Sequence, residues 1–146
     1  MIRRVLVVCI GNICRSPMAE GLIRQAVPGV QISSAGLSSA LVGRGADPIA
    51  VQIMAGIGVD ISAHRARMLT DAIARETDLI LVMDDQQKQQ LETQYPYVRG
   101  KVFKLGEAAR QDIPDPYRQD PEVFSMVFSL IENGVNEWVK RINSIG

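Results

Sequence analysis

The stretch from Val5 to Pro17 constrains the fold more than any other part of the chain. Val5–Val8 is a short, wholly apolar run and predicts a buried strand of the kind found inside parallel sheets. The sequence CIGNICRSP follows, in which Ser16 can cap a helix and Pro17 suits its first turn. Such a strand–turn–helix unit directs backbone N–H groups and the positive end of the helix dipole at one point. The stretch therefore predicts a cradle for a phosphate-like dianion.

Segments with strand and helix character alternate along the rest of the chain. The expected strands are 2–8, 30–35, 78–83 and 102–105, and the expected helices are 17–26, 49–57, a short helix that opens at Thr70–Asp71, 85–94 and 121–142. Connections of this length favour a parallel sheet. We therefore expect an α/β fold in a single domain, 1–146, with a four-stranded parallel sheet, helices on both faces and the phosphate-binding loop after the first strand.

Ligands of such sheets bind beyond the carboxyl ends of the strands. Cys9 stands at the end of the first predicted strand, and Asp84 stands at the end of the third. We expect the functional site at this edge.

The composition excludes several kinds of partner. Sixteen basic residues balance sixteen acidic ones, so no nucleic-acid partner is expected and anion recognition must be local. Two cysteines and the lone His64 argue against a closed zinc site, so no metal is expected. No apolar run is long enough to span a membrane, and the run after Arg4 is too short for a secretory signal. These features predict a cytoplasmic protein with free thiols.

Cys9, Arg15 and Ser16 together suit nucleophilic attack on phosphorus. A helix N-terminus and a neighbouring guanidinium favour the reactive thiolate, and the Ser16 hydroxyl can donate a further hydrogen bond to it. The Arg15 fork can hold two oxygens of a phosphoryl group at once. Attack by Cys9 would give a thiophosphate intermediate, and the leaving group would need a proton from a general acid. Asp84, Asp85, Asp112 and Asp115 are all candidates for that acid on these grounds.

The loop from Cys9 to Pro17 is a Cys-x5-Arg-Ser motif with Asn12 at its centre, and it resembles the loop of the low-molecular-weight protein tyrosine phosphatases. The resemblance extends to Ser33–Gly36, to His64–Arg65 and to Asp115–Tyr117, in the same order along essentially the whole chain. It implies a phosphatase that hydrolyses phosphotyrosine in proteins and needs no cofactor.

The resemblance also implies a role for individual residues. Cys9 is the nucleophile, Arg15 binds the phosphoryl group, and Asp115 is the general acid and then the base that activates water. The phosphate-binding loop comprises Ile10, Gly11, Asn12, Ile13, Cys14, Arg15 and Ser16. Asn12 is implied to hold the strained loop, with support from Ser34 and His64.

The walls of the implied substrate cleft depart in part from the family pattern. Tyr117 would lie beside the phosphotyrosine ring, but Leu41 and Val42 stand where eukaryotic members have aromatic residues. In this respect the sequence is similar to the bacterial subgroup that acts on tyrosine autokinases controlling exopolysaccharide export. The expected partner is therefore a phosphotyrosine protein of that kind, and the enzyme is expected to act as a monomer.

Two other functions compete with this interpretation. A thiol-dependent arsenate reductase uses the same anion cradle, but its thioredoxin-linked members need further cysteines, and this sequence has none after Cys14. A phosphate-binding module without catalysis would have no use for Cys9 or for the late Asp115.

Cys14 has two interpretations of its own. The favoured one is a packed thiol. The other is a protective disulfide with Cys9, which predicts that a peroxide-treated enzyme regains activity with dithiothreitol and that its Cys14→Ser variant recovers far less.

Overall fold

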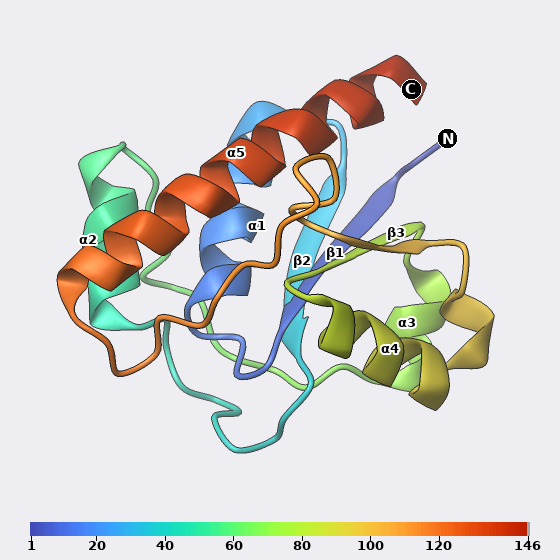
Figure 1. The fold of residues 1–146 in the computed structure, drawn as a ribbon, viewed down its shortest axis with the longest axis horizontal. Helices are drawn as coiled ribbons and strands as arrows, with labels where there is room; N and C mark the ends of the chain where they lie inside the picture. Colours follow the sequence, from blue (N-terminus) through green and yellow to red (C-terminus); the bar gives the residue numbers. More distant parts are fainter. Residues whose placement is uncertain (146) are drawn as a thin grey trace.

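The structure is a computed structural model that describes residues 1–145; Gly146, included in the predicted domain, lies outside the described residues. Its centre is a parallel sheet in the order β2-β1-β3-β4 (Figure 1). The strands are β1 (Arg4–Cys9), β2 (Gln31–Gly36), β3 (Leu79–Val82) and β4 (Val102–Lys104). The four predicted strands and their parallel arrangement are confirmed, with boundaries that differ by one or two residues.

Helices cover both faces of the sheet (Figure 1). One layer contains α1 (Arg15–Ala26), α2 (Pro48–Gly56) and α5 (Pro121–Ile145), and the other contains α3 (Asp71–Glu76), α4 (Asp85–Gln94) and the short 3-10 helix η1 (Pro96–Val98). The predicted helices are all present. The three-residue helix η1 has no counterpart among the predicted elements.

The alternation of side chains along β1 divides the core between the two layers. Val5 and Val7 belong to the cluster that includes α1, α2 and α5, and Leu6 and Val8 belong to the cluster that includes α3 and α4. The apolar stripe of α5 is buried as its spacing predicts, with Phe124 and Ile131 fully enclosed. The uninterrupted apolar sequence of β1 follows from the burial of this strand on both faces.

The strand order places a ligand site at the end of β1. The chain leaves β1 toward β2 on one side and returns past it to β3 on the other, so the connections diverge between the carboxyl ends of β1 and β3. A crevice at such a point is the usual ligand site in open α/β sheets. Cys9 ends β1, and Asp84 follows β3 closely.

Within residues 1–145, no helix combines the length and the apolar character needed to cross a membrane.

Candidate active site

The loop between β1 and α1 wraps around the sulfur atom of Cys9. Its central residue, Asn12, has a φ of 57°, a left-handed conformation that asparagine tolerates better than most residues. The end of β2 passes so close that a Cβ on Gly36 would lie 2.8 Å from the Ile10 carbonyl oxygen. A glycine at position 36 is therefore required by the close approach of the two backbones.

Ser16 contacts the sulfur directly and does not cap the helix. Its Oγ lies 2.9 Å from Cys9 Sγ, and the Asn12 N–H also donates to this sulfur at 3.3 Å. The predicted capping role of Ser16 was wrong: α1 begins at Arg15, and its N-cap residue, Cys14, makes no side-chain capping bond. The helix starts two residues earlier than predicted because its first turn forms part of the cradle.

The buried Asn12 side chain ties the loop to the sheet and to the loop around His64. Its Nδ2 donates to Ser16 Oγ (2.8 Å) and to Ser34 Oγ (2.9 Å), and its Oδ1 accepts from the Arg67 backbone N–H (3.0 Å). His64 Nε2 lies 2.6 Å from the Asn12 carbonyl oxygen, which can only accept, so this nitrogen carries a proton. Ser34 and His64, the two residues predicted to support the loop, thus each contact Asn12.

The hydrogen-bond chain determines where the Ser16 proton points. The Glu20 carboxylate accepts from Ser34 Oγ, so Ser34 is free to accept from Asn12. Ser16 also accepts from Asn12 Nδ2, which leaves its own proton for Cys9 Sγ. The arrangement therefore directs two hydrogen-bond donors, the Ser16 hydroxyl and the Asn12 N–H, at the Cys9 sulfur.

Arg15 is almost fully buried, with its guanidinium at the boundary of the cleft. Its Nη1 donates to the Ile113 carbonyl oxygen at 2.8 Å, and its Nη2 lies 3.7 Å from Asp115 Oδ2. The loop 106–120 thus holds the guanidinium in place, while the remaining N–H donors are available to an anion in the cradle.

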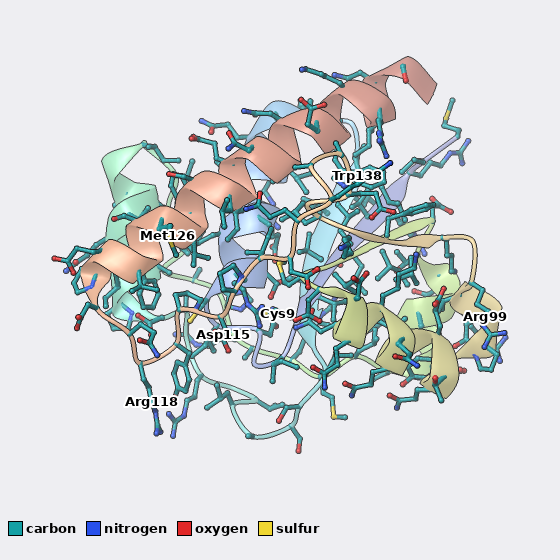
Figure 2. All side chains as sticks on the ribbon, in the orientation of Figure 1. Cys9, Arg99, Asp115, Arg118, Met126 and Trp138 are labelled. Atoms are coloured by element: carbon teal, nitrogen blue, oxygen red, sulfur yellow. The ribbon has the colours of Figure 1, made fainter. Side chains whose placement is uncertain are left out.

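The catalytic cleft, with a volume of about 380 Å³, opens above Cys9. Figure 2 shows Cys9 and Asp115 close together at this edge of the sheet, with Arg118 farther out. The residues lining the cleft are Cys9, Ile10, Gly11, Ile13, Cys14, Arg15, Ser38, Ala40, Leu41, Asp115, Tyr117 and Arg118. Of the residues named for the walls, Leu41 and Tyr117 line the cleft, whereas Val42 is exposed and is not among the lining residues.

The geometry separates the four candidate acids. Of these four acids, only Asp115 lines the catalytic cleft. Its side chain is 47% exposed, and its Oδ1 accepts from the Tyr117 N–H. Asp84 caps α4 by accepting from the Gln87 N–H, whereas Asp85 and Asp112 form ion pairs with Lys104. Of the four candidates, Asp115 is therefore the carboxyl group placed at the cleft above Cys9.

Arg118 is a residue of the cleft that the sequence analysis missed. It has a φ of 64°, and its guanidinium lies 5.1 Å from the centre of the Tyr117 ring. This contact is a cation–π interaction and orients the ring at the mouth of the cleft. Its position directly after Asp115–Tyr117 was the only available signal in the sequence.

Cys14 is buried and unpaired, as is Cys9. Burial, followed by the negative charge of Asp47, raises the pKa of the Cys14 thiol above its usual range. Cys14 is therefore a protonated, packed thiol at neutral pH, in agreement with the favoured interpretation. Within the described residues, no group of three or more His, Cys, Asp or Glu side chains could hold a metal ion.

Comparison with known proteins agrees with this geometry. Residues 4–145 match the family described as "Low molecular weight phosphotyrosine protein phosphatase". The chain is 52% identical over 146 residues, covering all of both chains, to the "Probable low molecular weight protein-tyrosine-phosphatase EpsP" of Ralstonia nicotianae. It is 41% identical to the "Low molecular weight protein-tyrosine-phosphatase Wzb" of Escherichia coli K12, covering 99% of this chain and 98% of the relative.

Two solved structures are similar over nearly the whole fold. Wzb of Vibrio vulnificus in complex with benzylphosphonate superposes with a TM-score of 0.93 at 36% identity, covering 97% of this chain and 99% of the other. The YwlE arginine phosphatase of Geobacillus stearothermophilus superposes with a TM-score of 0.89 at 27% identity, covering 97% and 94%. The full-length similarities agree with the phosphate cradle and the cleft above Cys9, and they show that the chain belongs to the family of low molecular weight protein-tyrosine phosphatases.

Proposed function

We propose that this enzyme hydrolyses phosphotyrosine through a cysteinyl-phosphate intermediate on Cys9, and that its substrate is a bacterial tyrosine autokinase involved in exopolysaccharide production. The observation that carries the proposal is that Cys9, Arg15 and Asp115 line one cleft. The full-length similarity to bacterial EpsP and Wzb supports the choice of substrate. A cytoplasmic location, where such a kinase domain would meet the enzyme, is part of the proposal.

In the first step, the Cys9 thiolate attacks phosphorus from the floor of the cradle. The S–P bond forms as the bond between phosphorus and the tyrosine oxygen breaks, and Asp115 gives its proton to the departing oxygen. Arg15 and the loop N–H groups hold the three non-bridging oxygens as they flatten in the transition state. Ser16 and the Asn12 N–H stabilise the thiolate before the attack.

In the second step, water attacks phosphorus and the S–P bond breaks. Asp115, now a carboxylate, accepts a proton from this water, and Cys9 leaves as the thiolate. Inorganic phosphate is released, and both residues return to their starting protonation states.

The rim of the cleft bears on the choice of phosphorylated side chain. Leu41 and Tyr117 offer an apolar and an aromatic wall to a flat ring. Because one similar structure is an arginine phosphatase, phosphoarginine is the informative counter-substrate. We expect hydrolysis of p-nitrophenyl phosphate and phosphotyrosine peptides in the presence of EDTA, inhibition by vanadate, and a lower kcat/KM for phosphoarginine. An absolute need for added metal, or a preference for phosphoarginine, would contradict the proposal.

The substrate itself is tested by capture with the Cys9→Ser variant, which retains the phosphate-binding loop but lacks the nucleophile. It should retain a tyrosine-phosphorylated kinase that the wild-type enzyme releases, with vanadate as competitor. The matched control is Cys9→Ser combined with Arg15→Ala, which should capture nothing because it cannot bind the phosphoryl group. Capture of phosphoproteins that include no tyrosine kinase would reject the autokinase assignment.

A further inference from the structure

A second cavity adjoins the catalytic cleft and shares Ile10, Arg15 and Asp115 with it. We call it the flanking cavity; its volume is about 490 Å³, and outside the shared residues it is formed by the start of α4 (Asp84, Gln86, Gln87, Gln90) and by the loop 112–114. A group bound there would lie beside a phosphotyrosine in the catalytic cleft. No catalytic step uses the residues that line this cavity alone.

The flanking cavity carries an excess of negative charge. Asp84, Asp112 and Asp115 line it, and Arg15 is the one basic residue among its lining residues. Lys104 is largely buried and is bonded to both Asp85 and Asp112, at 3.3 and 2.9 Å. Once a phosphoryl group engages Arg15 and Asp115 carries its proton, the Asp84 and Asp112 carboxylates remain at the flanking cavity, and Lys104, which is bonded to Asp112, is shared with Asp85. The partial positive charge at the start of α4, roughly half a unit, does not offset the excess.

Gln87 provides an independent indication of a ligand. Gln87 lines the flanking cavity but is only 2% exposed, and its Oε1 accepts from the Met83 N–H at 2.9 Å. Its Nε2, in contrast, is the one buried side-chain nitrogen or oxygen without a hydrogen-bond partner among the described residues. A buried donor left unpaired is costly, so an acceptor brought by a ligand would be favoured at this wall.

We propose that the flanking cavity is a substrate subsite for a lysine or arginine close in sequence to the phosphotyrosine. A basic side chain matches the carboxylates of Asp84 and Asp112, and a carbonyl oxygen of the same peptide matches Gln87 Nε2. A peptide supplies both groups, whereas a free metal ion or an amine supplies no acceptor. The proposal rests on the phosphotyrosine activity proposed above and defines the peptide sequence that the enzyme prefers.

The test compares matched phosphotyrosine peptides that carry a single lysine or a single glutamate at each position from three residues before to three residues after the phosphotyrosine. We expect the lysine peptide to have the higher kcat/KM at one or two neighbouring positions, by about fivefold at low salt. Most of the difference should lie in KM, and it should shrink as salt rises from about 20 to about 300 mM.

The Asp84→Asn variant tests whether the flanking cavity is responsible. Asparagine also caps helices well, so α4 keeps its capping bond while the charge is lost. The readout is the lysine-to-glutamate ratio within each enzyme, which cancels any change in basal turnover or active fraction. Asp112→Asn is the second variant, and circular dichroism verifies that both are folded. The matched control is Glu92→Gln, which removes the same charge from α4 outside the flanking cavity.

The proposal requires a lysine preference that falls toward unity in Asp84→Asn or Asp112→Asn and persists in Glu92→Gln. Equal kcat/KM for lysine and glutamate peptides at every position would overturn it, and so would an equal loss of preference in all three variants. If p-nitrophenyl phosphate is hydrolysed but no phosphotyrosine peptide is, the proposed function fails first, which separates the two conclusions.

Discussion

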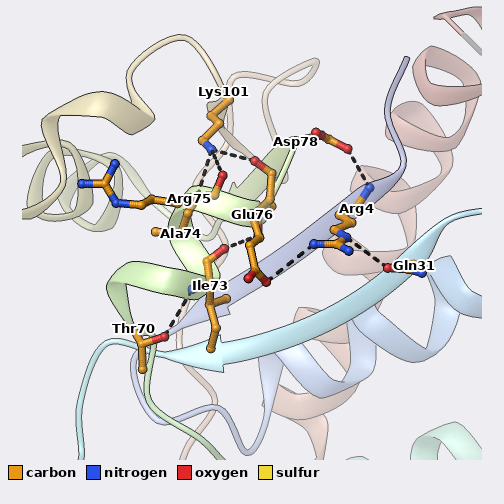
Figure 3. A network of polar contacts seen from close by, with 10 residues as sticks. Arg4, Gln31, Thr70, Ile73, Ala74, Arg75, Glu76, Asp78 and Lys101 are labelled. Carbon is orange, nitrogen blue, oxygen red and sulfur yellow. Dashed lines mark hydrogen bonds and ion pairs between the residues drawn. The ribbon is translucent and has the colours of Figure 1, made fainter.

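The two edges of the sheet use polar side chains in opposite ways. At the amino edge, Asp78 accepts hydrogen bonds from the backbone N–H groups of Arg3 and Arg4, both at 2.9 Å, and so joins the starts of β1 and β3. The Arg4 side chain reaches Gln31 at the start of β2 and Glu76 at the end of α3 (Figure 3). These side chains are exposed, and they pair with one another or with the backbone.

Lys101 completes this edge. Its ammonium group donates to the carbonyl oxygens of Ala74 (2.8 Å) and Thr77 (2.7 Å) at the end of α3 (Figure 3). Carbonyl groups at a helix end lack partners within the helix, and a cation there is favourable. Burial lowers the pKa of Lys101, but the carbonyl contacts hold the charged group in place.

At the carboxyl edge, by contrast, the polar groups are buried and converge on an open cleft. Asn12, Arg15, Ser16 and Ser34 are nearly inaccessible, yet their hydrogen bonds direct donors at Cys9. The φ of Asn12 is unfavourable for most residues and persists because the surrounding bonds fix it. Polar groups at the amino edge therefore stabilise the fold, whereas those at the carboxyl edge are arranged in advance for a reaction. Substitutions at the two edges should separate stability from turnover.

The largest effect is expected for Asp115→Asn, which should lower kcat on phosphotyrosine peptides by about 10²–10⁴-fold. The amide can still accept from the Tyr117 N–H, so the loop should keep its conformation. The loss should be smaller for p-nitrophenyl phosphate, whose leaving group needs less help from an acid. Steady-state kinetics on both substrates measures this, and a greater loss in Asp112→Asn would identify a different acid.

Gly36→Ala is expected to affect both stability and turnover. The new Cβ would lie 2.8 Å from the Ile10 carbonyl oxygen and 3.2 Å from Asn12 Cβ, so the backbone of the loop must move. We expect a loss of about 1–3 kcal/mol in the free energy of unfolding and a fall of tenfold or more, roughly, in kcat/KM.

Gly29→Ala is the matched control, because a Cβ there meets nothing within 4 Å. Urea unfolding and p-nitrophenyl phosphate kinetics on the two variants measure both effects. If Gly36→Ala lost stability while keeping full activity, the tight coupling between β2 and the catalytic loop would be wrong.

The sequence was sufficient for the parts of the fold that depend on repeating patterns. β1 could be predicted because a strand buried on both faces is apolar throughout, and α5 could be predicted because its buried face repeats about once per helical turn. The start of α1 could not, because Ser16 turns its hydroxyl toward Cys9 instead of capping the helix. The orientation of the Ser16 hydroxyl depends on Asn12, which is itself hydrogen-bonded to Ser34, 22 residues away.

The site was predictable where one loop contains the chemistry and not where distant loops meet. Cys9, Arg15 and Ser16 follow from a single strand–turn–helix unit. The choice among the four acids depends on the path of the loop 106–120, where Arg110 and Arg118 have positive φ and no periodic pattern exists. The resemblance to the family selected Asp115, and in the structure Asp115 lines the catalytic cleft whereas Asp112 is bound to Lys104. The unpaired Nε2 of Gln87 has no signal in the sequence at all.

Lys101→Met should lower stability without changing turnover. Methionine retains the length of the side chain but leaves the carbonyl groups of Ala74 and Thr77 without their donor. We expect a loss of about 1–2 kcal/mol in the free energy of unfolding and a kcat/KM close to that of the wild type. Lys140→Met, at an exposed ion pair with Glu137, is the control and should cost less than about 0.5 kcal/mol. A marked fall in kcat/KM for Lys101→Met would mean that the two edges are coupled.

The smallest effect is expected for Asp78→Asn, and it should depend on pH. The hydrogen bonds from the Arg3 and Arg4 N–H groups hold the pKa of the Asp78 carboxyl below its usual value near 3.8. A carboxyl whose pKa is lower in the folded than in the unfolded chain stabilises the fold above the unfolded pKa, and this contribution is lost as the pH falls through the folded pKa.

Asparagine keeps one acceptor but not the charge, and the site is exposed, so the difference from the wild type should be about 0.5–1 kcal/mol at pH 7 after allowance for solvent screening. Urea unfolding of both proteins at pH 7 and near pH 3 measures it, and the difference should shrink at the lower pH. Activity at pH 7 should stay at the wild-type level, because Asp78 lies at the edge opposite Cys9. A difference that stayed constant or grew at low pH would show that Asp78 stabilises this edge by means other than its charge.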